Sequence, residues 1–122
     1  MWDYRAQLIR VVDADTVVLL IDQGMSNRRE EALRLLNVSA PEHNKPGGPQ
    51  ATAFTQQWMN ALSPAWRWPM RVLTQPNTKR EPEEDRTYVR YLATVSDMAL
   101  ERCLNDDLRA YLAEHPEWGH GM

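Results

Sequence analysis

The sequence has little of what defines several protein classes. Its single cysteine, Cys103, cannot form an intrachain disulfide, which fits a reducing compartment and equally a cysteine-poor exported protein. No apolar run approaches the roughly 18 residues of a membrane span, and residues 1–10 lack the basic start and apolar core of a signal peptide. A signal removed beforehand would leave the same trace. We expect a cytoplasmic protein that does not associate with membranes.

The chain also lacks a net positive charge. The formal net charge is -3 at pH 7, whereas proteins that coat nucleic acid normally carry a large positive excess. Any contact with phosphate groups must therefore be local. Internal repeats and low-complexity segments are absent as well, so the chain has no sign of a repeat architecture.

What is present suffices for one globular domain. The 122 residues are 43% hydrophobic and include five tryptophans, enough apolar surface for a single core but not for two. We expect one domain over residues 1–122 and a monomer. Residues 115–122, "HPEWGHGM", either form a flexible tail or return to the domain through Trp118.

The first half of the chain predicts three strands and a helix. Segments 4–12, 16–22 and 30–38 are rich in β-branched and aliphatic residues. The tight polar link "DADT" predicts a hairpin between the first two, and "QGMSNRR" predicts a longer, flexible turn before the third. A loop rich in Pro and Gly follows at 42–48, and a helix is expected over 49–62, with Pro49 in its first turn.

The second half predicts two more strands and a second helix. Segment 67–75 has strand character, although Pro69 should confine it to an edge or a bulged start. Segment 86–95 alternates polar and apolar residues. A helix is expected over 97–115 with Asp97 as its N-cap, and its predicted apolar face is formed by Leu100, Cys103, Leu104, Leu108, Tyr111 and Leu112.

This order predicts an α+β, mainly β, fold. A five-stranded OB-type barrel, with one helix inserted between strands three and four and another at the C-terminus, accommodates it. A sandwich and other α+β arrangements also fit the pattern.

Several polar residues fall where a phosphodiester-cleaving site would need them. Hydrolysis of a phosphodiester requires a group that activates water, cations that neutralise the phosphoryl oxygens, and usually a hard metal ion. Guanidinium groups clamp phosphate, and carboxylates suit calcium or magnesium. The candidates for these roles are Asp13, Asp15, Thr16, Arg34, Glu42 and Arg90.

Taken one at a time, each candidate also has a structural explanation. Asp13 and Asp15 flank a tight turn, where Asp commonly bonds nearby backbone amides. Arg34 could lie on the solvent face of its strand and pair with Glu31 or another neighbour. Glu42 fits a solvated loop residue, and Arg90 fits a surface charge that alternates with apolar neighbours.

Taken in order, the segments resemble the staphylococcal nuclease (thermonuclease) family. "VVDADTVVLL", "LRLLNVSAPE", "GPQATAFTQQW" and "DRTYVRYLATV" are similar to that family's D-G-D-T, R-L-x-x-(I/V)-D-x-P-E, G-x-x-A and D-x-Y-G-R-x-L-A. The likeness covers roughly residues 5–95. The first two motifs are fairly specific together, and the last two corroborate them.

The resemblance implies a role for each matched position. Asp15 falls on the calcium-ligand aspartate, with Asp13 and Thr16 on supporting positions. Arg34 falls on the first phosphate-clamping arginine, and Glu42 on the glutamate assigned to general-base or water-orienting work. Arg90 falls on the second arginine, which stabilises the transition state.

Two departures from the family pattern concern the metal and the second arginine. The family's other calcium-ligand aspartate is Ser39 here, followed by Ala40, whose position supplies a backbone carbonyl ligand. A hydroxyl is a weaker ligand than a carboxylate, so the site should bind Ca²⁺ more weakly or select another divalent cation. Tyr88 and Val89 replace the family's Y-G, and Arg90 matches with one inserted residue.

Two functions follow. The first is a metal-dependent nuclease that hydrolyses DNA or RNA with Glu42, Arg34 and Arg90. The second is a catalytically weakened or inactive module of the same fold that binds nucleic acid or a protein partner, with aromatic residues such as Trp66, Tyr88 or Tyr91 stacking on bases.

The remaining reactive side chains predict no further site. The three histidines, His43, His115 and His120, lack metal-ligand spacing and are expected at the surface. Cys103 is expected as a core thiol without a histidine partner.

Overall fold

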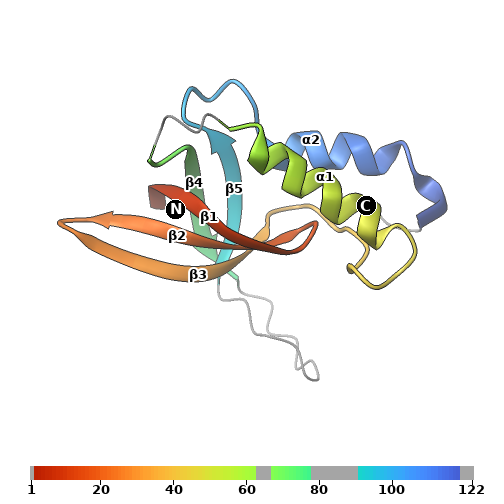
Figure 1. Cartoon of the computed structure of the whole chain (residues 1–122), viewed down its shortest axis with the longest axis horizontal. Helices are drawn as coiled ribbons and strands as arrows, with labels where there is room; N and C mark the ends of the chain where they lie inside the picture. The colour runs from red at the N-terminus through yellow and green to blue at the C-terminus, as the bar shows by residue number, and fades with distance from the viewer. Residues whose placement is uncertain (1, 63–66, 78–90, 119–122) are drawn as a thin grey trace.

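A computed structural model describes residues 2–62, 67–77 and 91–118. Figure 1 shows a β-barrel with two helices beside it. The elements, in chain order, are β1 (Trp2–Asp13), β2 (Thr16–Gly24), β3 (Asn27–Leu35), α1 (Gly48–Asn60), β4 (Met70–Pro76), β5 (Tyr91–Asp97), α2 (Leu104–Ala113) and the short 3₁₀ helix η1 (Pro116–Trp118).

The five strands close into a barrel in the order β1-β2-β3-β5-β4. β3 and β5 are parallel, with Leu33 opposite Tyr91 and Leu35 opposite Ala93, whereas the other neighbours are antiparallel. The helix between β3 and β4 and the helix after β5 complete an α+β, mainly β, OB-type barrel. The predicted fold class is therefore confirmed.

Closure corrects the prediction for β4. Pro69 was expected to confine this strand to an edge or to a bulged start, but β4 pairs with both β1 and β5. The strand begins at Met70, directly after the proline. Because Pro69 stands outside the ladder, its missing N–H removes no hydrogen bond from the barrel.

The turn between β2 and β3 is shorter than predicted. Gly24 pairs with Asn27, so only Met25 and Ser26 form the turn, with φ angles of 53° and 67°. Positive φ at both central residues matches the twist of a two-residue hairpin. The prediction of a longer turn was wrong because neither residue is one that usually signals this conformation.

The second helix begins later than predicted. Asp97 ends β5, and its Oδ1 accepts hydrogen bonds from the backbone N–H groups of Glu101 and Arg102 instead of capping a helix. Leu100 has a φ of 60° and lies exposed in that turn. Cys103, half-buried, occupies the N-cap position of α2. Local bonding by the Asp97 side chain competes with helix formation here.

The core is continuous from the barrel into the helical layer. α1 and α2 lie side by side beside the barrel (Figure 1), and Trp58 Nε1 of α1 donates to Asp107 Oδ2 of α2 at 2.8 Å. Trp118 packs against this core and stacks on His115. The largest fully buried side chains include Leu19, Leu33, Leu35, Met70, Leu104, Leu108 and Leu112.

Within the described part of the chain, no helix has the length and apolar character needed to cross a membrane.

Candidate functional site

Asp15 is the buried centre of the candidate site. It lies in the two-residue link between β1 and β2 and is only 6% exposed. Its Oδ2 accepts a hydrogen bond from the backbone N–H of Ala40 at 3.2 Å, and its Oδ1 accepts one from the Thr16 hydroxyl at 3.3 Å. The bond to Ala40 joins segments distant in sequence, so a purely local turn role for Asp15 is wrong.

Burial gives this carboxylate an unusual titration. Desolvation raises the pKa of Asp15 above its ordinary value of 3.8, and the charge of Arg34 and the Ala40 hydrogen bond oppose that rise. Burial destabilises the charged form of this carboxylate, and an additional positive charge placed beside it would stabilise that form. The site is therefore electrostatically receptive to a cation.

Arg34 lies on β3 directly opposite Thr16 of β2. Its Nη2 is 3.4 Å from Asp15 Oδ2, and its side chain is 47% exposed. Arg34 thus lies on the solvent face of its strand and pairs with a neighbour, as the structural explanation expected, but that neighbour is Asp15, and Glu31 pairs with Arg29. One side of the Arg34 guanidinium thus faces a carboxylate while much of the group remains open to solvent, which leaves donors available for an anionic ligand.

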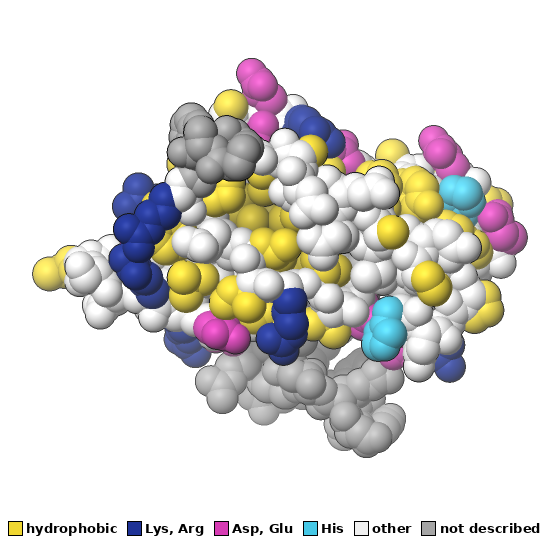
Figure 2. Space-filling view, viewed as in Figure 1, with side chains coloured by type: hydrophobic (Ala, Val, Ile, Leu, Met, Phe, Trp, Pro, Cys, Tyr) yellow, Lys and Arg dark blue, Asp and Glu magenta, His cyan; other side chains and the backbone are white. Residues whose placement is uncertain are grey.

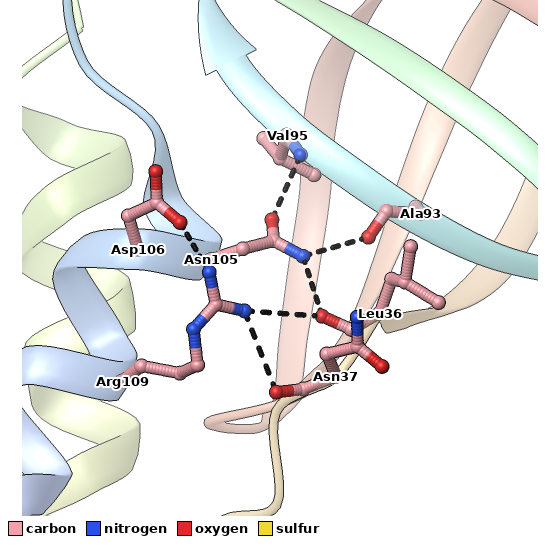
Figure 3. Close-up of polar contacts among 7 residues, drawn as sticks. All are labelled: Leu36, Asn37, Ala93, Val95, Asn105, Asp106 and Arg109. Atoms are coloured by element: carbon pink, nitrogen blue, oxygen red, sulfur yellow. Dashed lines mark hydrogen bonds and ion pairs between the residues drawn. The ribbon is translucent and has the colours of Figure 1, made fainter.

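The chain leaving β3 is fixed by α2, as Figure 3 shows. Asn105, 2% exposed, donates to the carbonyls of Leu36 and Ala93 and accepts from the N–H of Val95. The Arg109 guanidinium donates to the carbonyls of Leu36 and Asn37 and pairs with Asp106. These bonds attach β5 and the start of the β3–α1 connection to the N-terminal part of α2. They therefore fix the point from which residues 38–43 leave the barrel.

Further along this connection, Asp13 forms a second attachment to the first hairpin. Its Oδ1 accepts the backbone N–H of His43 at 2.8 Å and lies 2.7 Å from His43 Nδ1. Asp13 therefore supports the loop that carries Glu42, not the local turn. His43 is exposed, as predicted, with 61% of its side chain accessible.

Glu42 is half-buried and lies between the two residues, Ala40 and His43, that bond the first hairpin. Its carbonyl accepts the N–H of Lys45 at 2.9 Å. Gly48 packs so closely on this turn that a Cβ there would meet the Glu42 carbonyl oxygen at 1.8 Å. The Glu42 backbone is thus positioned by contacts on both sides.

The structure brings most, but not all, of the predicted site into one region. Asp15 contacts both Thr16 and Arg34. The segment 39–42, in which Ser39 is half-buried, is held beside them by the hydrogen bond from the Ala40 N–H to Asp15. Arg90 lies outside the described residues. It directly precedes Tyr91, which pairs with Leu33 beside Arg34.

The donor set suits a divalent cation only weakly. No group of three or more His, Cys, Asp or Glu side chains comes together in the part of the chain that the structure describes. A cation would depend on Asp15, the Ser39 hydroxyl and the Ala40 carbonyl, with water completing a hard-cation shell. Burial of the Asp15 charge favours such an ion, whereas the neighbouring Arg34 guanidinium competes with it.

A small pocket lies along β3, between Arg29 and Leu33. It has a volume of about 140 Å³ and is lined by aromatic and polar residues, among them Trp2, Tyr4, Gln23, Arg29, Glu31 and Tyr91. Pockets for small-molecule ligands usually measure about 300–1,000 Å³. Tyr91 meets Trp2 edge-on at 6.4 Å. Of the other aromatics predicted to stack on bases, Trp66 and Tyr88 lie outside the described residues.

Asn105, Arg109 and the His43–Asp13 contact were not predicted from the sequence. A polar Asn at an otherwise apolar helix position was a usable signal, since a buried amide must find hydrogen-bond partners. The His43–Asp13 pair had no signal in the sequence, because it depends on how the loop crosses the first hairpin.

Comparison with known proteins adds no relative: neither a protein-family model nor a curated protein matches this chain.

Proposed function

We propose that the chain is a nuclease of the staphylococcal nuclease type that hydrolyses phosphodiester bonds of DNA or RNA. The observation that carries the proposal is the half-exposed Arg34 guanidinium beside buried Asp15, at the point where the loop bearing Glu42 is bonded to the first hairpin. A phosphate-binding donor, a buried anion and a candidate base thus come from three separate segments of one fold.

In the proposed reaction, Arg34 binds the non-bridging phosphate oxygens through its solvent-facing donors. Glu42 accepts a proton from the attacking water as the new oxygen–phosphorus bond forms. The ester bond on the opposite side of phosphorus breaks, and the leaving oxygen is protonated from solvent. Arg90 would supply a second guanidinium for the charge that develops on the phosphoryl oxygens.

Asp15, Ser39 and the Ala40 carbonyl would hold a divalent cation such as Ca²⁺. When bound, such an ion supplies electrostatic stabilisation to the phosphoryl oxygens. With one carboxylate in this donor set, we expect weak affinity and therefore a requirement for a high cation concentration.

A second candidate is a module of the same fold that binds nucleic acid without cleaving it. The observation in its favour is that both Asp15 oxygens already have protein partners, the Ala40 N–H, the Thr16 hydroxyl and Arg34. In this form the site would retain phosphate binding by Arg34 and lack a resident cation.

The deciding experiment measures cleavage of single-stranded DNA and RNA with a divalent cation and then with EDTA. We expect Glu42→Gln, which removes the base and keeps the side-chain shape, to lower kcat/KM by about 100-fold or more. Arg34→Lys should lower it by a similar factor, since Lys cannot donate bidentately. Arg29→Lys is the matched control, because Arg29 lies on the same strand and also pairs with a carboxylate.

Cleavage that is unchanged in Glu42→Gln would remove Glu42 from the mechanism. Binding of both polymers without any cation-dependent cleavage would replace the nuclease by the second candidate.

A further inference from the structure

Three arginines surround one tryptophan on the barrel, away from the Arg34 site. The guanidinium carbons of Arg5, Arg28 and Arg67 lie 5.7, 5.9 and 5.4 Å from the centre of the Trp68 ring. The three residues are exposed, whereas Trp68 is 9% exposed. The indole therefore serves as a platform that orients cations, and is too covered to stack on a base itself.

These residues come together through strand pairing. Arg5 of β1 lies opposite Asp22 of β2, and Asp22 lies opposite Arg28 of β3, so the three side chains form a row across one face. Arg71 of β4 extends the row on the other side of Arg5 and is paired with Asp3. Figure 2 shows Lys and Arg side chains gathered near the base of the projecting β2–β3 hairpin.

The charge of this arginine cluster, Arg5, Arg28 and Arg67, is incompletely neutralised. Arg5 Nε bonds Asp22 Oδ2 at 2.6 Å. Among the described residues, no carboxylate lies within ion-pair distance of Arg28 or Arg67, whereas Arg29, Arg71, Arg102 and Arg109 each have one. Like charges held around one ring repel each other, so this arrangement is suited to an anionic partner that offsets the repulsion.

We propose that the arginine cluster binds the phosphate backbone of a nucleic acid strand, forming a second contact surface about 20 Å along β3 from Arg34. Arg34 follows Arg28 by six positions on β3, which is an even offset, and the register is unbroken between them, so both side chains face outward on the same side of the barrel. Glu30 is the acidic residue between them on that side.

The inference rests on the proposed function in taking nucleic acid as the partner, but it concerns binding and not hydrolysis. Phosphate contacts position a strand without reading its sequence. Two separated contacts on one face would favour strands long enough to span both. A net-negative protein would thereby gain local attraction for a polyanion that its overall charge does not supply.

The test is fluorescence anisotropy with a labelled single-stranded 20-nucleotide DNA in EDTA, which separates binding from cleavage. For single strands each phosphate contact contributes about -0.7 to the slope of log K against log salt concentration. We expect Arg28→Gln and Arg67→Gln each to reduce the slope by about that amount and to weaken binding at low salt. Arg28→Lys keeps the charge and should retain most of the slope.

Arg102→Gln is the matched control, because Arg102 also lies over a tryptophan, Trp58, but has Asp107 as a counter-ion. Equal slopes for wild type, Arg28→Gln and Arg67→Gln would overturn the proposal. So would a poly-glutamate peptide of equal charge binding as tightly as the DNA. If Glu42→Gln loses cleavage but keeps the wild-type slope of log K against log salt concentration, hydrolysis and binding by the arginine cluster are separate properties, and each proposal is supported on its own.

Discussion

At the scale of single residues, Asp15 shows how a candidate site differs from a surface ion pair. Its carboxylate is buried, its pKa is raised chiefly by desolvation, and its partners are an amide, a hydroxyl and a half-exposed guanidinium. A fold selected for stability alone gains little from keeping a buried charge in this position. The observed contact of this carboxylate with Arg34 is consistent with the site proposed above.

The sign of the pKa shift gives a testable pH dependence. The pKa of Asp15 is raised above its ordinary value of 3.8 in the folded state. Between pH 3.8 and this higher folded-state pKa, the folded state binds more protons than the unfolded state. The free energy of unfolding therefore falls as pH rises from 3.8 through the folded-state pKa. We expect Asp15→Asn, which cannot ionise, to lack this decline and to equal or exceed wild-type stability at pH 7. Urea unfolding between pH 3 and pH 7 measures the difference.

Asp22→Asn is the opposite-sign control. The pKa of Asp22 is lowered, first by the Gly24 N–H and then by Arg5, so its stabilising contribution is present above 3.8 and is lost as pH falls through the folded-state pKa. An Asp15→Asn variant that loses stability relative to wild type as pH rises would contradict the account of Asp15.

At the scale of elements, the connection from β3 to α1 is the part of the fold that builds the site. It is held at its start by Asn105 of α2, in its middle by Asp15 and Asp13, and at its end by close packing of Gly48 on Glu42. None of these attachments is made by the loop to itself, so the loop's shape depends on the barrel and on the helices.

Removal of the Asn105 amide should weaken the attachment of β5 and of the β3–α1 connection to α2. Asn105→Ala removes this partner from two buried backbone groups, on Ala93 and Val95, and from a partly buried one on Leu36, and we expect a loss of about 3 kcal/mol in the free energy of unfolding. Asn60→Ala, at an exposed amide that bonds only Gln56 among the described residues, should change it by less than about 0.5 kcal/mol. Chemical denaturation compares the two, and equal losses would contradict the role of Asn105.

Gly48 offers a way to displace Glu42 without altering its chemistry. Gly48→Ala places a methyl group against the Glu42 backbone, and we expect a stability loss of about 3 kcal/mol together with reduced cleavage at temperatures where the variant remains folded. Gly24→Ala is the control: it has a φ of 88° but open space around it, so it should cost about 1 kcal/mol and leave cleavage intact. Full cleavage by folded Gly48→Ala would show that the Glu42 position is not critical.

At the scale of the whole molecule, the strands and the two helices were predictable because apolar residues recur at the strand and helix periods, whereas closure into a barrel was not, because the same pattern also fits a sandwich. The start of α2 was not predictable either, since Asp97 and Leu100 fit a helix in isolation and only the turn geometry shows otherwise. The contact of Asp15 with Arg34 agrees with the region expected from the sequence, whereas the assigned chemistry remains a proposal.

The arginine cluster could not be predicted from the sequence at all. Arg67 directly precedes Trp68, but Arg5 and Arg28 lie on distant segments, and strand pairing brings them to the same tryptophan. The net charge of -3 is an overall sum and gives no sign that three arginines gather on one surface. Charge distribution, unlike net charge, is a property of the folded molecule.

Whether Glu42 and Arg34 act on a phosphodiester is decided by cation-dependent cleavage of single-stranded nucleic acid, compared between wild type, Glu42→Gln and Arg29→Lys. We expect cleavage by wild type and Arg29→Lys that EDTA abolishes, and a decrease of about 100-fold or more in Glu42→Gln. Equal cleavage by all three proteins, or none by wild type at any cation concentration, would contradict the proposed function.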